Sequence, residues 1–354
     1  MKQFDYDKEC NSIIDTDIVN LLTSIHEYKG KQELYFSTQP DVLSKLVDIS
    51  KIQSTDASNR IEGIRTSDSR LKELMEKKTE PRNRNEEEIA GYRYVLDMIH
   101  ESHDYIPISV NDVLSLHKYL YKFNSTTNIG GKLKTTDNII QETDENGNSF
   151  VRFKPASAFL TPQYLQDMCS SYNKAIEKGI IDPLILIPCF ILDFLCIHPF
   201  DDGNGRMSRL LTLLLLYKSN YFVGKYISLE MIIEKSKETY YDSLQASSAR
   251  WNENENDYKP FLRYTLGVVL NAYREFEDRF KTVYIKKEDS ITRVLNVISK
   301  SYAKLNKNEI ISLCPEFSKK SIERALGILV KENKIIKVGI NKSTAYVLNR
   351  EKKE

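Results

Sequence analysis

The sequence predicts a mainly α-helical protein: a helical bundle that carries a β-hairpin, followed by a small domain of three helices and a second hairpin. Three observations predict this fold. Only 13 of the 354 residues are glycine, and strand-like alternation is rare, so we expect helices over most of the chain. Two almost wholly apolar runs, residues 184–197 and 210–217, are typical of helices buried on all sides. Hydrophobic residues make up 41% of the chain, which is enough for a sizeable core.

The length and the cysteines set the class of protein. A chain of 354 residues predicts two or three domains. The five cysteines (Cys10, Cys169, Cys189, Cys196 and Cys314) form no CxxC pair, so we expect reduced thiols and no cysteine metal site. The N-terminus has mixed charge without an apolar core, so it predicts no signal peptide. Neither apolar run reaches the ~18–20 residues of a membrane span. We therefore expect a cytoplasmic protein without a membrane partner.

The net charge of +1 hides an asymmetry along the chain. Residues 286–354 contain 16 basic and 8 acidic residues, whereas residues 1–285 carry a net charge of −7. A basic tail on an acidic body indicates modules with different partners. We predict an N-terminal helical region over 1–105, a core domain over 106–285 and a tail domain over 286–354.

The apolar periodicity predicts the elements in order. We expect helices near 40–62, 68–78, 85–102, 109–121, 161–178, 184–198, 205–219, 228–248, 257–284 and 290–301. Residues 137–153 differ, because apolar pairs flank an Asn-Gly dipeptide at 146–147, as in a β-hairpin. An isolated hairpin is marginally stable, so this one should lie against the helical body.

The tail has the pattern of three helices and a wing. Helices are expected from Asp289 to Lys300, from Asn308 to Leu313, and from a cap at Ser318 to about Asn333. Residues 335–338 and 344–348 then flank a Gly-Ile-Asn-Lys turn. This order resembles a winged helix. Lys319, Lys320 and Arg324 could contact DNA phosphates. A protein-contact or dimer-contact role for the same segment is equally open, because a charge run alone rarely proves nucleic-acid binding.

Residues 198–209, with the sequence HPFDDGNGRMSR, carry the strongest chemical signal. Gly203 and Gly205 allow a tight turn and close approach of the backbone. Backbone N–H groups at such a turn, opening into a helix, form an anion site. Arg206 and Arg209 are one helical turn apart, and the planar arginine fork suits phosphate.

Two further residues of this segment add reactive groups. Asp202 offers a hard oxygen ligand beside the anion site, where a magnesium ion bridging phosphates would bind. His198 lies just before the turn and can act as a general base near neutral pH. Because the segment joins the two buried helices, it is predicted to be a polar loop on a rigid mounting.

This segment resembles the signature of Fic proteins, HxFx(D/E)GNGRxxR. All fixed positions match: His198, Phe200, Asp202, Gly203, Asn204, Gly205, Arg206 and Arg209. The resemblance implies a Fic-type helical bundle. It also implies that the hairpin at about 137–153 is a flap, which holds an extended segment of a target protein beside the histidine.

The resemblance further implies a protein adenylyltransferase, which moves AMP from ATP to a Ser, Thr or Tyr hydroxyl of a protein. His198 would take the hydroxyl proton, and Asp202 would hold Mg²⁺. Gly203, Gly205 and the Asn204 backbone and side chain would bind phosphate oxygens. Arg206 and Arg209 would neutralise the β- and γ-phosphates. The target could be another protein or the chain itself.

A second motif, SNRIEG at residues 58–63, indicates regulation. Ser58 and Glu62 share a helical face, and Gly63 is the residue expected just past a helix end. Glu62 would then lie at the helix C-terminus, where the dipole disfavours its charge by ~0.3–1 kcal/mol, so it needs a cationic partner. Arg209 is the natural partner. The segment resembles the Fic inhibitory helix, (S/T)xxxE(G/N), at about 54–63, which implies that Glu62 fills the space of the γ-phosphate.

Weaker similarities surround the core motif. GYRYVL at 91–96, the Tyr240–Tyr241 pair and WNENEND at 251–257 look like stretches of larger bacterial Fic proteins. They imply that Tyr240, Tyr241 and Asn252 lie at the adenine pocket. Packing of the tyrosines in the core is the alternative.

Other functions remain open from the sequence. If Glu62 orients a water molecule, the same site could remove AMP, and some Fic proteins transfer UMP, phosphate or phosphocholine. In another class of function, the tail makes the chain a DNA-binding regulator with the Fic core as a nucleotide sensor. The sequence does not identify the protein target, the trigger or the oligomeric state, and it leaves a homodimer open.

Overall fold

We describe a computed structural model of the chain. It describes residues 2–36, 40–76, 79–125, 127–143, 149–287, 289–301, 304–315, 317–339 and 344–349. The chain divides into two compact units, Met1–Glu277 and Asp278–Glu354. Each unit is described by itself.

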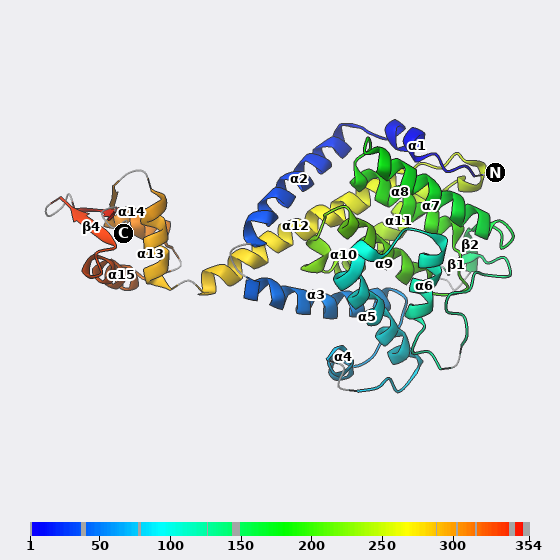
Figure 1. Cartoon of the computed structure of the whole chain (residues 1–354), viewed down its shortest axis with the longest axis horizontal. Helices are drawn as coiled ribbons and strands as arrows, with labels where there is room; N and C mark the ends of the chain where they lie inside the picture. The colour runs from blue at the N-terminus through cyan, green and yellow to red at the C-terminus, as the bar shows by residue number, and fades with distance from the viewer. Residues whose placement is uncertain are drawn as a thin grey trace. The chain divides into compact units, whose positions relative to one another are not determined.

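The first unit is built from helices, as the sequence predicts (Figure 1). They are α1 (Tyr6–Ser12), α2 (Thr16–Phe36), α3 (Pro40–Ile61), α4 (Asp68–Met75), α5 (Arg84–Ser102), α6 (Val110–Leu120), α7 (Thr161–Lys178), α8 (Pro183–Ile197), α9 (Asn204–Lys218), α10 (Leu229–Lys235) and α11 (Lys237–Ser248), with 3₁₀ turns at His103–Tyr105, Val223–Lys225 and Trp251–Glu253. Helix α12 (Lys259–Lys287) begins in this unit and continues past Glu277. No helix within the described ranges has both the length and the apolar character needed to cross a bilayer.

The predicted helix ends hold to within a few residues, with two errors. Helices α1 and α2 were not predicted. The single helix expected over 228–248 is wrong, because the chain forms α10 and α11 with a break at Ser236. Ser236 has φ −117° and ψ 33°, and its N–H donates to the carbonyls of Ile232 and Ile233, which closes α10. The predicted end of the second helix, at 77–78, lies outside the described residues.

The two apolar helices, α8 and α9, form the centre of the core, and α7 packs on α8. Nearly every side chain of α8 is buried, which confirms the prediction for residues 184–197. Gly91 lets α5 touch α6, because a Cβ at this position would lie 1.8 Å from the Leu120 carbonyl oxygen. Close packing of this kind gives the loop between α8 and α9 a rigid base.

A buried carboxylate in α8 holds the N-terminal segment and the 251–258 region together. Asp193 accepts hydrogen bonds from the hydroxyl of Tyr6 at 2.8 Å, from Nε1 of Trp251 at 2.6 Å and from the hydroxyl of Tyr258 at 3.0 Å. The Nζ of Lys2 donates to Tyr258 at 2.9 Å. Burial raises the pKa of Asp193, and the three donors satisfy the carboxyl group there.

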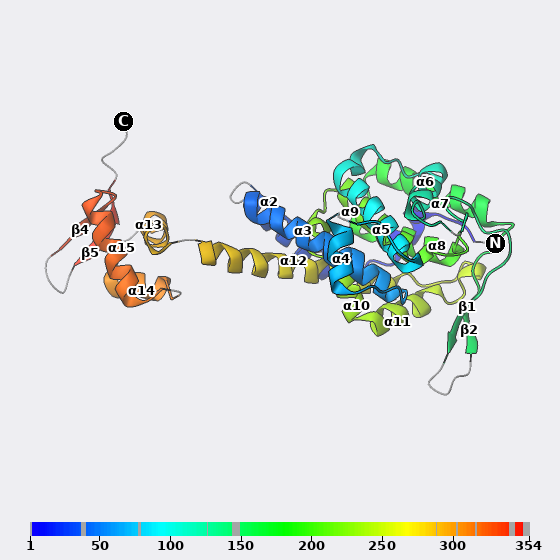
Figure 2. The same cartoon turned by 90° about the horizontal axis from the view of Figure 1, so that it is seen from below.

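The predicted hairpin consists of β1 (Ile140–Thr143) and β2 (Ser149–Phe153), paired antiparallel with Ile140 opposite Phe153 and Thr143 opposite Ser149. Its predicted turn at 144–147 lies outside the described residues. Figure 2 shows the strands projecting from the helical body. The base of β2 lies against α11, so the hairpin is supported by the bundle.

The second unit contains α13 (Ser290–Lys300), α14 (Lys307–Leu313) and α15 (Lys319–Lys331) with a small sheet. Strand β5 (Ala345–Leu348) lies between β3 (Leu305–Asn306) and β4 (Ile335–Val338). Ser318 caps α15, as predicted, by accepting from the N–H of Ser321. Strand β3 was not predicted, and the turn residues 340–342 lie outside the described part.

Candidate active site

The loop between α8 and α9 begins and ends with left-handed residues. His198 closes α8 with φ 50° and ψ 61°, and Gly203 precedes α9 with φ 82°. Glycine adopts this conformation freely, whereas histidine does so only when its surroundings hold it there. Loops that hold such strain in a rigid core are typical of functional sites.

Asn204 and Phe200 fix the inside of the loop. Nδ2 of Asn204 donates to the Phe200 carbonyl at 2.8 Å, and its Oδ1 accepts from the Phe200 N–H at 3.0 Å. The Phe200 ring is buried and stacks on His117, with 3.6 Å between the ring centroids. Asn204 therefore shapes the loop with its side chain, and its predicted side-chain contact with phosphate stays a prediction.

His117, which sequence reasoning missed, supports the loop from α6. Its Nδ1 accepts from the Gly131 N–H at 3.0 Å, and its Nε2 lies 3.0 Å from the Asp202 carbonyl oxygen, to which it donates. Burial lowers the pKa of His117 to about 4. The ring is therefore neutral near pH 7, which these two bonds require. No motif marked this residue.

His198 points into a pocket with one ring nitrogen free to act as a base. Its Nδ1 lies 3.3 Å from the Leu195 carbonyl oxygen, and since a carbonyl only accepts, Nδ1 carries the proton and Nε2 does not. Burial lowers the pKa of His198 to about 4. The imidazole is therefore neutral near pH 7 and can accept a proton.

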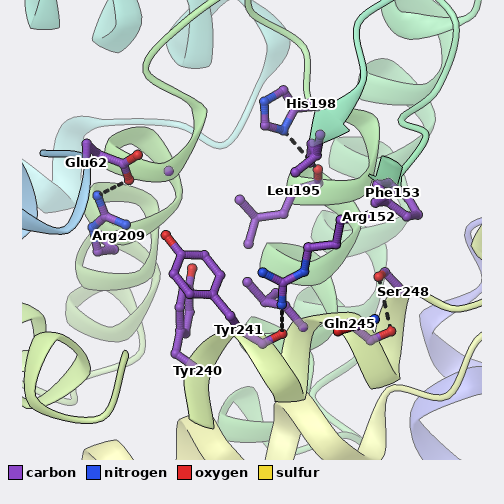
Figure 3. Close-up of a pocket in the computed structure, with 13 residues that line it drawn as sticks. Glu62, Arg152, Phe153, Leu195, His198, Arg209, Tyr240, Tyr241, Gln245 and Ser248 are labelled. Carbon is purple, nitrogen blue, oxygen red and sulfur yellow. Dashed lines mark hydrogen bonds and ion pairs between the residues drawn. The ribbon is translucent and has the colours of Figure 1, made fainter. Parts of the chain in front are cut away.

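The pocket in front of His198 lies between the loop, the hairpin and α11 (Figure 3). It encloses about 200 Å³, which is small beside the ~300–1,000 Å³ of pockets for drug-sized ligands. Its lining residues are Glu62, Ile140, Arg152, Phe153, Leu195, His198, Gly205, Arg209, Tyr240, Tyr241, Leu244, Gln245 and Ser248.

Glu62 and Ser58 meet Arg209 at one side of this pocket. Nη2 of Arg209 donates to Oε1 of Glu62 at 2.7 Å, and its Nε donates to the Ser58 hydroxyl at 2.8 Å. The Glu62 carboxylate lies against Gly205, where an added Cβ would be 2.3 Å from Oε1. An acidic side chain therefore occupies the N-terminus of α9, where the helix dipole and backbone N–H groups attract anions.

Arg206 lies elsewhere, beneath the loop. Its side chain is 1% exposed, and its Nη1 is 2.7 Å from Oε2 of Glu88 in α5. Its Nη2 donates to the Tyr121 hydroxyl at 2.9 Å. The structure therefore does not bring Arg206 to the pocket, and its predicted contact with a phosphate stays a prediction.

Asp202 is exposed enough to receive a metal ion. Its side chain is 44% exposed, and its Oδ2 lies 3.3 Å from Nη2 of Arg84. The described residues include no cluster of three or more metal-ligating side chains. Mg²⁺ is commonly held by one or two carboxylates together with substrate phosphates. Asp202 does not line the pocket and precedes α9 by two residues. A single carboxylate beside that helix N-terminus fits the arrangement.

The aromatic pair and Asn252 differ in their placement. Tyr240 and Tyr241 both line the pocket, as Figure 3 shows. Asn252 does not line it, because its Nδ2 donates to the Lys154 carbonyl at 3.0 Å beside the base of the hairpin. Arg152 of β2, which sequence reasoning did not single out, has its guanidinium carbon 4.9 Å from the centre of the Tyr241 ring.

Comparison with known proteins agrees with this geometry. Residues 107–216 match the model of the Fic/DOC family. This chain carries a Fic domain. The Fic match begins just before α6, ends within α9 and contains the whole loop with His198.

Several curated relatives of this chain are named protein adenylyltransferases. The chain is 26% identical to protein adenylyltransferase fic-1 of Caenorhabditis elegans over 176 residues. This aligned segment covers 49% of this chain and 30% of the relative. It is 44% identical over 69 residues to protein adenylyltransferase Fic of Aedes aegypti, which covers 19% of this chain and 11% of the relative. The matches thus span less than a third of either relative.

Solved Fic structures share the fold at low identity. A Fic family protein from Desulfovibrio desulfuricans G20 superposes with a TM-score of 0.62 at 20% identity, over 96% of this chain and 98% of that one. Residues 134–508 of fic-1 from C. elegans give 0.59 at 20% identity, over 75% and 73% of the two chains. These similarities confirm the Fic helical fold.

Proposed function

We propose that this protein transfers AMP from ATP to a Ser, Thr or Tyr hydroxyl of a protein, and that Glu62 inhibits the transfer. The observation that carries the proposal is the pocket itself. A neutral His198 and the N-terminus of α9 face the same space, which Tyr240 and Tyr241 also line. The names of the relatives support the choice of ATP and of a protein as substrates.

The reaction would be an in-line displacement. Nε2 of His198 takes the proton of the target hydroxyl, and the hydroxyl oxygen attacks the α-phosphorus of ATP. The bond from that phosphorus to the bridging oxygen breaks, and pyrophosphate leaves. Backbone N–H groups at Gly203–Gly205 and the Arg209 guanidinium would stabilise the phosphate charge. Proper placement of the reactants supplies much of the rate enhancement in such a site.

Asp202 would hold a magnesium ion, which supplies neutralising charge to the phosphates when it is bound. Its carboxylate lies at the start of α9, and Oδ1 already accepts from the Gly203 N–H at 2.6 Å. The second oxygen faces Arg84. A metal ion would therefore compete with a solvent-exposed guanidinium.

Inhibition would follow from the position of Glu62. Its carboxylate binds the Arg209 guanidinium and lies against Gly205. A triphosphate that used the same N-terminus and the same arginine would meet a like charge at short range. Lys237 and Arg60 hold the inhibitory segment in place, because Lys237 donates to the Ile61 carbonyl and Arg60 binds Glu234 of α10.

Removal of AMP from a modified protein is the second candidate. Glu62 and His198 line one pocket, and the Glu62 side chain is 33% exposed. A carboxylate in this position could orient a water molecule toward a phosphorus bound beside Gly205. In this reaction Glu62 is required, whereas in AMP transfer its loss is activating.

The first prediction separates these functions. The full chain is incubated with ATP labelled at the α-phosphate, as the Glu62→Gly variant and as the double variant with His198→Ala. We expect label on protein with Glu62→Gly, and a loss of roughly 10²–10⁴-fold on adding His198→Ala, because a general base contributes about that much. Mass spectrometry of the labelled protein measures the mass of the added group and so tests whether it is AMP.

Three results would contradict the proposal. Equal labelling by the double variant would remove His198 from the chemistry. Label from the γ-phosphate and none from the α-phosphate would indicate phosphate transfer. If Glu62→Gly labels nothing and instead abolishes release of AMP from a modified protein, removal is the activity of this site.

A further inference from the structure

Lys134 is a buried lysine between α6 and β1 that no motif marks. It is 3% exposed. Lysine is among the residues least often buried, because its ammonium group loses water unless hydrogen bonds replace it. A buried ammonium group such as that of Lys134 therefore needs hydrogen-bond acceptors in the protein.

The three protons of the Lys134 ammonium have three acceptors. Nζ lies 2.9 Å from Oδ1 of Asn138, 2.7 Å from the Ala156 carbonyl oxygen and 2.9 Å from the Ile197 carbonyl oxygen. Asn138 precedes β1, Ala156 follows β2, and Ile197 is the last residue of α8. One ammonium group thus joins both ends of the hairpin to the end of the helix that bears His198.

The same lysine holds the backbone on both sides of the histidine. Its Nζ binds the Ile197 carbonyl, and its own N–H donates to the Pro199 carbonyl at 2.9 Å. His198 lies between these two carbonyls with φ 50°. Such a conformation persists only where the surrounding structure fixes it. In addition, a cation at the C-terminus of α8 interacts favourably with the helix dipole.

Two further bonds join the hairpin base to the same place. The Ala156 N–H donates to the Cys196 carbonyl at 3.2 Å. Nδ2 of Asn138 donates to the Phe200 carbonyl at 3.5 Å. The hairpin and the loop that carries His198 are therefore connected through Lys134 and its immediate partners.

We propose that Lys134 is a positioning residue, which fixes the direction of the His198 imidazole and its separation from the hairpin. A hydroxyl presented on the hairpin and the base that deprotonates it would then keep their relative position during the reaction. This inference depends on the proposed transfer function for its catalytic consequence. Its geometric content, the control of His198 by Lys134, does not depend on that function.

The charges around His198 give a readout that is independent of activity. Burial is the main cause of its low pKa, Lys134 lowers the pKa further, and Glu62 and Asp202 raise it. Replacing Lys134 by an uncharged residue removes one lowering influence, so the pKa of His198 should move upward. A variant that merely loosens the fold elsewhere would not move it in this way.

The test compares Lys134→Met with Lys134→Arg and with Lys2→Met. Lys2 is the matched control: it is 4% exposed, and its Nζ contacts Glu9, Asn256 and Tyr258, none of which belongs to the His198 loop. All variants carry Glu62→Gly in the full chain. Folding is checked by the fluorescence of Trp251, the single tryptophan, and ATP binding by calorimetry.

Lys134→Met should slow transfer of α-label by roughly 10–100-fold while ATP affinity stays within about twofold, because a misplaced base costs rate and not binding. Lys134→Arg should recover most of the rate, and Lys2→Met should keep it. The proton signals of the five histidines, with His198 assigned through His198→Ala, should show an upward pKa for His198 in Lys134→Met alone.

Two outcomes would overturn the inference: a normal rate in Lys134→Met, or an unmoved His198 pKa together with equal losses in Lys134→Met and Lys2→Met. If Lys134→Met does not fold, Asn138→Ala replaces it, since this removes one acceptor and the bond to Phe200. It should then slow transfer without weakening ATP binding, and a normal rate would contradict us. If the parent Glu62→Gly chain transfers nothing, the proposed function fails, and the His198 titration still decides the role of Lys134.

Discussion

Two neighbouring arginines of α9 each form an ion pair with a glutamate at the same distance, but the two glutamates differ in their exposure to solvent. Arg206 meets Glu88 at 2.7 Å, and Arg209 meets Glu62 at 2.7 Å. Both arginines belong to the first turns of α9 and are almost fully buried. The glutamates differ: the Glu88 side chain is 3% exposed, whereas that of Glu62 is 33% exposed.

The supports of the two glutamates also differ. Glu88 lies inside α5 and binds Arg84 as well as Arg206. Glu62 lies just past the end of α3, beside Gly63, and faces the pocket. A carboxylate fixed within a buried helix stabilises the loop, and a carboxylate at an exposed helix end can leave. If Glu62 inhibits as proposed, the Arg206–Glu88 pair therefore supports the loop, whereas the Glu62 carboxylate can move away from Arg209.

Removing the charge of Glu88 should have the largest effect on stability. Glu88→Gln removes the nearer carboxylate of the buried Arg206 guanidinium and leaves Asp202, whose Oδ1 lies 3.7 Å from Nη2. Loss of one partner of a buried pair costs about 3–5 kcal/mol. We expect the thermal midpoint of the first unit to fall by many degrees, measured through Trp251 fluorescence in the full chain. A shift no larger than that of an exposed pair in the same unit, such as Lys31→Gln at its contact with Glu27, would contradict the assignment.

The matched substitution Glu62→Gln should cost about 1 kcal/mol or less, as for partly exposed pairs. Arg209 keeps its bonds to the hydroxyl and carbonyl of Ser58. It also lines the pocket, so water or a phosphate can replace the lost carboxylate. The measurement is the same fluorescence midpoint, with and without ATP. A loss equal to that of Glu88→Gln would show that Glu62 is a structural residue.

Of the two ion pairs, the sequence predicted only the one between Arg209 and Glu62. The motif at 198–209 and the spacing of Ser58 and Glu62 led to the pairing with Arg209, because short-range helical geometry and a fixed signature carry that information. The buried helices at 184–197 and 210–217 and the hairpin were predicted from periodicity and an Asn-Gly turn. The fold that the relatives share confirms the helical class.

The Arg206–Glu88 pair could not be predicted from the sequence, because its contacts join segments far apart in the chain. Glu88 and Tyr121 reach Arg206 from α5 and from the end of α6. Nothing in their local sequence distinguishes them from a surface glutamate and a core tyrosine. Lys134 is likewise an ordinary lysine in a loop until three carbonyl and amide oxygens converge on it. Helix α1 is likewise held by a distant residue, because Tyr6 donates to Asp193 of α8.

The smallest effect is a coupling between variants, and it tests whether the two pairs are independent. Tyr121→Phe removes one hydrogen bond to Arg206 and should cost about 0.5–1.5 kcal/mol. Because Tyr121 and Glu88 bind the same guanidinium, Tyr121→Phe combined with Glu88→Gln should deviate from the sum of the single effects by more than about 0.5 kcal/mol. Combined with Glu62→Gln, it should add within that limit, since those residues share no partner. Denaturant midpoints of the four chains in each cycle give the coupling. Equal coupling in both cycles would mean that the Arg206–Glu88 and Arg209–Glu62 pairs act as one network. Movement of Glu62 away from Arg209 would then loosen the loop that holds His198.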